Sequence, residues 1–156
     1  MNLPVIAPEW LYFLLLACLA AAAVEDAARL RISNVTSAAV ALLAIASILI
    51  AGPDWSLWQN LMIFAAILAI GTAAFAKGML GGGDVKLLAA VGLWAPLKLA
   101  LPLLGAIFLA GGVIAVLAML FWQFRKSGAS SMKTRRIPYG LAIALGTASV
   151  FHSARF

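Results

Sequence analysis

Long apolar segments separated by short polar loops run through the whole chain. Six such segments are expected, at about residues 10–24, 35–51, 57–76, 85–94, 99–124 and 139–151. Leu3 is an alternative start for the first of them. Most approach the roughly 20 apolar residues that a helix needs to cross a bilayer. The pattern predicts an all-α, polytopic membrane protein with about six transmembrane helices, in a single membrane-embedded domain that occupies residues 1–156.

Basic residues decide whether the shortest segment, residues 85–94, crosses the membrane. At a rise of 1.5 Å per residue it reaches only about half of a ~30 Å hydrocarbon core, so a re-entrant segment is the alternative. If all six segments cross, Lys98 and Arg155 lie on one side of the membrane. The other basic residues then share the opposite side: Arg29, Arg31, Lys77, Lys86, Arg125, Lys126, Lys133, Arg135 and Arg136. The positive-inside rule therefore favours six crossings, with both termini outside the cytoplasm.

Composition narrows the class of protein. Hydrophobic residues make up 65% of the chain and charged residues 10%, against about 25% charged residues in an average soluble domain. The net charge of +6 comes from basic residues in loops between apolar segments, which indicates orientation in a lipid bilayer and no nucleic-acid partner. Cys18 and His152 are the only residues of their types, so we expect no metal site and no cofactor.

Three glycines followed by a carboxylate, Gly81, Gly82, Gly83 and Asp84, separate the third and fourth apolar segments. Glycine has no side chain, so another backbone can come close to the Asp84 carboxylate. On this interpretation Asp84 is presented for chemistry. The alternative is ordinary turn chemistry, in which Asp84 caps the N-terminus of a helix that starts at residue 85.

Asp26 is the second candidate for chemistry, because the expected topology puts it at the same cytoplasmic face as Asp84. Two aspartates that share a water cannot both ionise easily, so the pair retains one proton. The ionised carboxylate can then activate water while the protonated one polarises a carbonyl. The two residues lie on different segments, and only the tertiary fold can bring them together. The alternative for Asp26 is a solvated charge beside Arg29, one helical turn away.

These residues belong to three ordered motifs. Gly81, Gly82, Gly83 and Asp84 match the G-x-G-D signature of intramembrane aspartyl proteases, and the extension into residues 85–87 resembles the type IV prepilin peptidases. In that family the first catalytic Asp is followed after five residues by Ile or Leu, usually Pro, then Asn or Asp. Here Asp26 is followed by Ile32, Ser33 and Asn34 at that spacing, with Ser33 where the family usually has Pro. Residues 136–144 resemble the C-terminal signature of the family's short members.

The resemblance implies a particular enzyme and substrate. The chain has no cysteine tetrad of the kind found in bifunctional prepilin peptidases and is similar to the small TadV/CpaA-type enzymes of Flp (tight-adherence) pili. The resemblance thus implies an aspartic endopeptidase of the bacterial inner (cytoplasmic) membrane, without methyltransferase activity. It would remove the short basic leader of a prepilin or pseudopilin at the cytoplasmic face, with the pilus assembly machinery as a further partner.

The same resemblance suggests roles for the remaining motif residues. Asp26 and Asp84 would be catalytic. Substrate binding or shaping of the site would fall to Gly81, Gly82, Gly83, Lys86, Asn34, Arg136, Pro138, Tyr139 and Gly140. Lys86 could lower the pKa of Asp84 or contact a phospholipid head group, and the second interpretation is preferred. Pro138 is expected near the first position of the last helix.

Other functions remain open at this point. A transporter or proton-conducting protein would also use membrane carboxylates, but it predicts a polar path to the outer side, and the segments carry few polar residues. A non-catalytic scaffold for pilus assembly would use the aspartates only as caps and would tolerate Asp84→Asn. An archaeal preflagellin peptidase, which also uses two aspartates, is a further alternative, although residues 136–140 favour the bacterial pilus branch.

Overall fold

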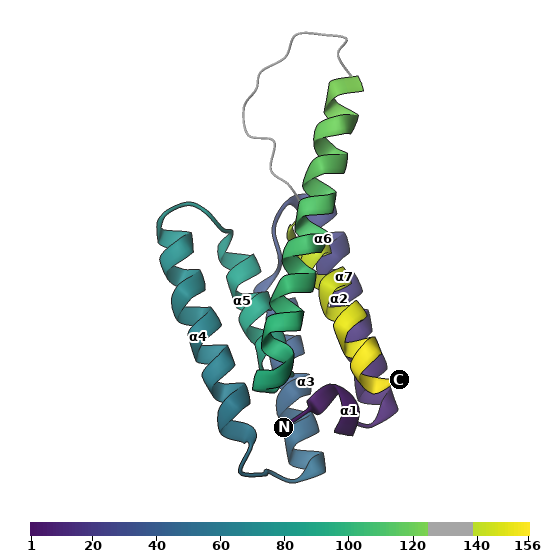
Figure 1. The fold of residues 1–156 in the computed structure, drawn as a ribbon, viewed down its shortest axis with the longest axis vertical. Helices are drawn as coiled ribbons and strands as arrows, with labels where there is room; N and C mark the ends of the chain where they lie inside the picture. Colours follow the sequence, from purple (N-terminus) through teal and green to yellow (C-terminus); the bar gives the residue numbers. More distant parts are fainter. Residues whose placement is uncertain (125–138) are drawn as a thin grey trace.

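The computed structural model describes residues 1–124 and 139–156, and these residues form helices and no strands. The helices are α1 (Leu3–Ile6), α2 (Glu9–Arg29), α3 (Asn34–Ala51), α4 (Leu57–Ala76), α5 (Gly82–Gly92), α6 (Leu97–Phe124) and α7 (Tyr139–Arg155). The prediction of an all-α fold is confirmed. Figure 1 shows α2 to α7 running alternately up and down, with both termini at the same end of the bundle.

The short helix α5 lies at the centre of this arrangement and packs against α3, α4 and α7 (Figure 1). Small and apolar side chains let the neighbouring helices surround it, and Leu87, Ala89, Ala90 and Val91 are all buried. The buried indole N–H of Trp94, just after the helix, donates to the Val40 carbonyl of α3 at 3.1 Å. Helix α5 is therefore fixed on several sides, which makes its N-terminal end a rigid support.

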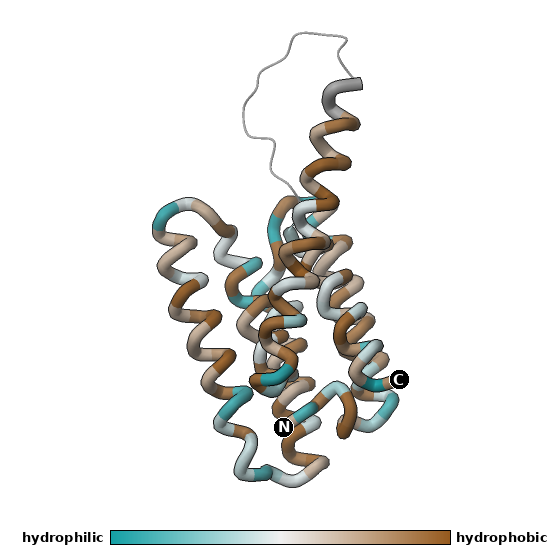
Figure 2. Tube along the Cα trace, viewed as in Figure 1, coloured by the Kyte–Doolittle hydropathy of each residue, from teal (hydrophilic) through white to brown (hydrophobic). Residues whose placement is uncertain are grey.

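In the part of the chain that the structure describes, four helices are long and apolar enough to cross a membrane, namely α2, α3, α4 and α6. Hydrophobic residues run along these helices (Figure 2). Many of their large apolar side chains are exposed, as expected of surfaces that face lipid. Helices α5 and α7, with 11 and 17 residues, do not reach that length. The crossing of six segments and the outside location of both termini remain predictions.

Several helix boundaries differ from those predicted. Helix α2 continues to Arg29, so Asp26 belongs to a helix and not to the first polar loop; Ala27 and Ala28 favour this extension. It begins at Glu9 and not at Leu3, because Ala7, which precedes Pro8, is extended and separates it from α1. Helices α5 and α6 are two separate helices, joined by the turn at residues 93–96.

Candidate active site

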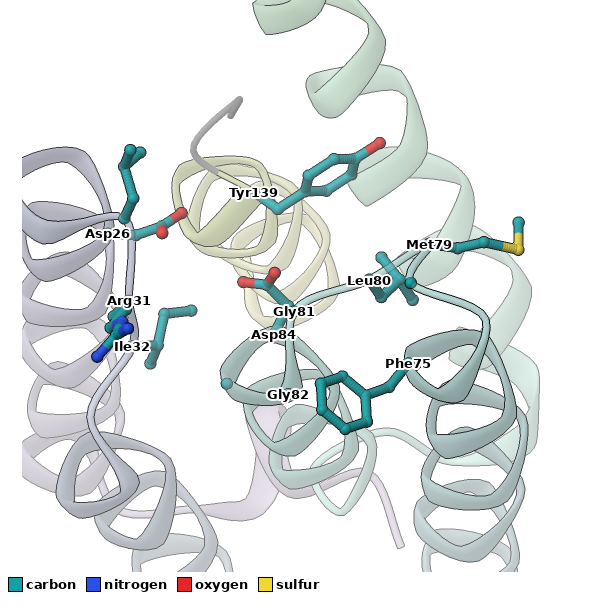
Figure 3. Close-up of a pocket in the computed structure, with 13 residues that line it drawn as sticks. Asp26, Arg31, Ile32, Phe75, Met79, Leu80, Gly81, Gly82, Asp84 and Tyr139 are labelled. Atoms are coloured by element: carbon teal, nitrogen blue, oxygen red, sulfur yellow. The ribbon is translucent and has the colours of Figure 1, made fainter. Parts of the chain in front are cut away.

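A cavity of about 720 Å³ opens at the end of the bundle opposite the two termini (Figure 3). Its walls come from the end of α2 and the following loop, the α4–α5 connection, and the first residue of α7. The residues that line it are Asp26, Leu30, Arg31, Ile32, Phe75, Gly78, Met79, Leu80, Gly81, Gly82, Gly83, Asp84 and Tyr139. Segments far apart in the sequence thus line one open cavity.

Asp26 is one of the few buried charged residues, with 5% of its surface exposed. Its Oδ2 accepts a hydrogen bond of 2.6 Å from the backbone N–H of Gly140, in the first turn of α7. The N–H groups at the start of a helix have no partner within it and favour a negatively charged acceptor. The interpretation of Asp26 as a solvated charge beside Arg29 is therefore wrong, because this residue is buried and its carboxylate accepts a hydrogen bond from the first turn of α7.

Asp84 occupies the third position of α5, whose N-cap is Gly81. It is therefore not the N-cap residue, and the helix begins at Gly82, three residues before the predicted start. The backbone N–H of Gly81 lowers the pKa of Asp84, and the third-position acid of a capping box likewise faces the N–H of its N-cap residue. Burial, and then the nearby charge of Asp26, raise the pKa of Asp84 from its usual 3.8 to about 6. At this position, outside the four long apolar helices, the carboxylate takes up a proton more readily than an ordinary aspartate does.

The two aspartates face the same space. Figure 3 shows the Asp26 carboxylate projecting from α2 and the Asp84 carboxylate projecting from the start of α5 into the cavity between them. Because the two carboxylates face the same space, the charge of Asp26 contributes to the raised pKa of Asp84. Two carboxylates that line one cavity are groups of the kind used in acid and base catalysis.

Each glycine of the G-x-G-D motif has a different structural role. A Cβ atom on Gly81 would lie 2.6 Å from Asp84 Oδ2, and one on Gly83 would lie 3.0 Å from the Ile32 carbonyl oxygen. A Cβ on Gly82 would meet the Phe75 ring at 3.4 Å, an ordinary contact. A side chain at the first or third glycine would therefore force a close neighbour to move, which is Asp84 Oδ2 for Gly81 and the Ile32 backbone for Gly83. The backbone that comes close to Gly83 is the protein's own loop at Ile32.

Tyr139 and Gly140 at the start of α7 complete the site on the third side. Tyr139 is partly exposed and lines the cavity (Figure 3). Gly140 is buried, and a Cβ there would lie 2.8 Å from the Asp26 Cβ and 3.0 Å from Ile32 Cδ1. The absence of a side chain at Gly140 lets α7 approach close enough to bind Asp26.

Asn34 and Lys86 lie away from the aspartates. The Lys86 ammonium donates to Asn34 Oδ1 at 2.8 Å, which ties the start of α3 to α5. Both residues border a second hollow of about 260 Å³ between α3, α4 and α5. Burial, Asp26 and Gly81 account for the pKa of Asp84, and Lys86 is not among the causes. Arg136 and Pro138 lie outside the described residues.

Sequence reasoning missed several residues of the cavity. Arg31 and Phe75 line it, together with Leu30, which adopts a left-handed conformation with φ of 52° at the end of α2. No pattern in the sequence distinguishes these side chains from ordinary loop and lipid-facing residues. Glu25, which lies outside the cavity, was also missed, although its acidic type beside Asp26 in a chain with few acids was a signal. The described residues hold no group of three His, Cys, Asp or Glu side chains placed to bind a metal.

Comparison with known proteins agrees with this geometry. Residues 13–120 match the sequence model of the Type IV leader peptidase family. This chain belongs to that family. No curated protein and no solved structure matches it. The matched residues run from α2 into α6 and include both aspartates, whereas α7, with the Gly140 N–H that binds Asp26, lies beyond them. Membership implies that the chain is a membrane peptidase whose substrate is a type IV prepilin.

Proposed function

We propose that this leader peptidase is an aspartic endopeptidase in which Asp26 and Asp84 form the catalytic pair. The observation that carries the proposal is that both carboxylates enter one cavity, with Asp26 held by the backbone N–H of Gly140 and Asp84 carried by the first turn of α5. Held in this way, the carboxylates do not have to reorganise when a substrate arrives, and such preorganisation is a main source of catalytic power.

The environment of each carboxylate suggests its role. Asp84, whose pKa is raised to about 6, is the one that carries the shared proton. Asp26 accepts the Gly140 N–H, a bond that strengthens when the acceptor is negatively charged, and it serves as the base. Because the two groups are coupled, the titration of each depends on the charge of the other.

The reaction then needs only water and the two carboxylates. Asp26 takes a proton from the water while the water oxygen bonds to the scissile carbonyl carbon. At the same time Asp84 gives its proton to the carbonyl oxygen. When the tetrahedral intermediate collapses, the C–N bond breaks and Asp26 passes its proton to the leaving amine. Asp84 recovers a proton from the intermediate's hydroxyl, which restores the starting state.

We further propose that the substrate is an Flp-type prepilin or pseudopilin, cut at the cytoplasmic face of the bacterial inner membrane. The resemblance to small TadV/CpaA-type enzymes supports this assignment. The cavity lies at one end of the bundle, where the leader of a substrate whose apolar helix lies in the bilayer would arrive. The same resemblance to the small enzymes implies that the new N-terminus is not methylated.

Co-expression with an Flp-type prepilin tests the proposal. The wild type, Asp26→Asn and Asp84→Asn are compared by the mobility shift of the prepilin, with the membrane level of each enzyme measured. Both variants should lose cleavage at normal abundance, because Asn preserves shape and hydrogen bonding but cannot carry the proton. Full processing by either variant would exclude the two-carboxylate mechanism and favour a scaffold. The mass of the mature pilin shows whether its new N-terminus is methylated.

A further inference from the structure

Glu25 precedes Asp26 on α2 and makes two hydrogen bonds that cross to α3. Its Oε2 accepts the backbone N–H of Ser33 at 3.0 Å and the hydroxyl of Thr36 at 2.9 Å. Ser33 is the N-cap of α3 and Thr36 is its third residue, the position from which a capping-box glutamate reaches back to the N-cap amide. Thr36 is too short for that task. Glu25 supplies the missing carboxylate from the preceding helix.

The loop that Glu25 closes contacts the supports of both aspartates. Ile32, the residue before Ser33, is buried. Its backbone packs on Gly83, the neighbour of Asp84, where a Cβ would lie 3.0 Å from the Ile32 carbonyl oxygen. Its Cδ1 lies against Gly140, whose N–H binds Asp26. Ile32 therefore sits between the start of α5 and the start of α7.

Glu25 itself does not line the cavity that contains the aspartates. Successive residues of a helix point about 100° apart, so Glu25 cannot share the direction of Asp26. A third catalytic carboxylate is therefore excluded by position. Glu25 can affect the reaction only by holding the α2–α3 loop in place.

From these contacts we infer that Glu25 is a positioning residue, which fixes the α2–α3 loop so that Ile32 keeps Asp26 and Asp84 at their working separation. This inference rests on the proposed function, since it assigns the reaction to those two aspartates. The acceptor oxygen of Glu25 is what matters, and its charge contributes only through attraction to the N-terminus of α3.

Steady-state kinetics of the purified full chain in detergent test this role, with a synthetic prepilin peptide that contains a basic leader and the start of its apolar helix. Glu25→Ala should lower kcat by tenfold or more with KM within about twofold, because small displacements of catalytic groups cost up to ~10²-fold in rate. Glu25→Gln retains an acceptor oxygen of the same reach, so it should keep kcat within about threefold of the wild type. Glu9→Ala, at the exposed far end of α2, is the matched control and should have no effect.

Folding and catalysis are separated by measuring kcat per monodisperse enzyme after size exclusion. If Glu25→Ala does not yield monodisperse protein, Thr36→Val removes one of the two bonds more gently and should still lower kcat by about threefold. A wild-type kcat for Glu25→Ala, or for Thr36→Val where the alanine variant does not fold, would overturn the inference. A loss in Glu25→Gln as large as in Glu25→Ala would also overturn it, because the charge or proton of Glu25 would then be required.

Parallel assays of Asp26→Asn and Asp84→Asn keep the two proposals apart. If both are inactive and Glu25→Ala is normal, only the role of Glu25 fails. If either remains fully active, the proposed catalytic pair fails, and the positioning role fails with it.

Discussion

Asp26 and Gly140 are 114 positions apart, and the N–H of Gly140 donates to Asp26 Oδ2 at 2.6 Å. This bond joins the end of α2 to the start of α7. It orients a buried carboxylate and at the same time satisfies one of the free N–H groups of α7. The last helix is thus part of the site, although its side chains contribute only Tyr139 to the cavity wall.

Gly140→Ala should reduce catalysis strongly. The new Cβ would lie 2.8 Å from the Asp26 Cβ, so either α7 or Asp26 has to move. We expect kcat/KM to fall by about 100-fold, the cost of a displacement near 1 Å. Gly112→Ala on α6, where a Cβ meets no atom within 4 Å, is the matched control and should be silent. Equal activity of the two variants would contradict the importance of this contact.

The glycines before Asp84 should differ in their tolerance of a methyl group. Gly81→Ala places a Cβ 2.6 Å from Asp84 Oδ2 and should displace the carboxylate, so that cleavage is largely lost. Gly82→Ala makes only an ordinary contact with Phe75 and should retain activity within about twofold. Cleavage rates of the two variants at matched membrane levels provide the comparison. A more damaging effect at Gly82 would show that the start of α5 is placed differently.

The raised pKa of Asp84 predicts a pH-dependent effect on stability. Its pKa is about 6 when folded and is expected near 3.8 when unfolded, so its favourable contribution is complete below 3.8 and is lost as the pH rises through 6. Asp84→Asn stays neutral throughout. Its melting temperature in detergent, relative to the wild type, should therefore increase between pH 4 and pH 7. A difference that does not change with pH would contradict burial as the main cause of the shift.

Six crossings predict the side on which each connection lies. In a Cys18→Ser background, single cysteines are placed at Trp55, Lys77 and Lys98, three exposed positions at helix ends. A membrane-impermeant thiol reagent added to intact cells should label Trp55→Cys and Lys98→Cys, and should label Lys77→Cys only after lysis. Labelling of Lys98→Cys only after lysis would make α5 re-entrant.

The apolar pattern predicts the helices well because membrane segments carry a strong and continuous signal. The pattern misplaces the end of a helix where the helix continues into charged residues, as α2 does at Asp26, because charged residues are also typical of loops. The start of α5 at Gly82 was missed because consecutive glycines usually indicate a turn. In the structure Gly81 is the N-cap of the helix, and close neighbours leave little room for a side chain at Gly81 or Gly83.

The candidate site was likewise predictable where it depends on local sequence motifs and unpredictable where it depends on tertiary contacts. Asp26 and Asp84 could be selected from the sequence because few residue types perform this chemistry and their motifs are ordered. The Gly140 bond to Asp26 and the Glu25 bonds to α3 depend on tertiary contacts that no local pattern encodes. Lys86 and Asn34 were grouped with the aspartates because they belong to the same motifs, and the structure pairs them with each other outside the cavity.

The most direct measurement of the central claim is cleavage of a synthetic prepilin peptide by the purified wild type, Asp26→Asn and Asp84→Asn, with the products identified by mass spectrometry. The account predicts a single cut between leader and apolar helix by the wild type. It predicts no product above background from either variant, although both remain folded and monodisperse. Cleavage at the same bond by either variant at the wild-type rate would contradict a reaction carried by this pair of carboxylates.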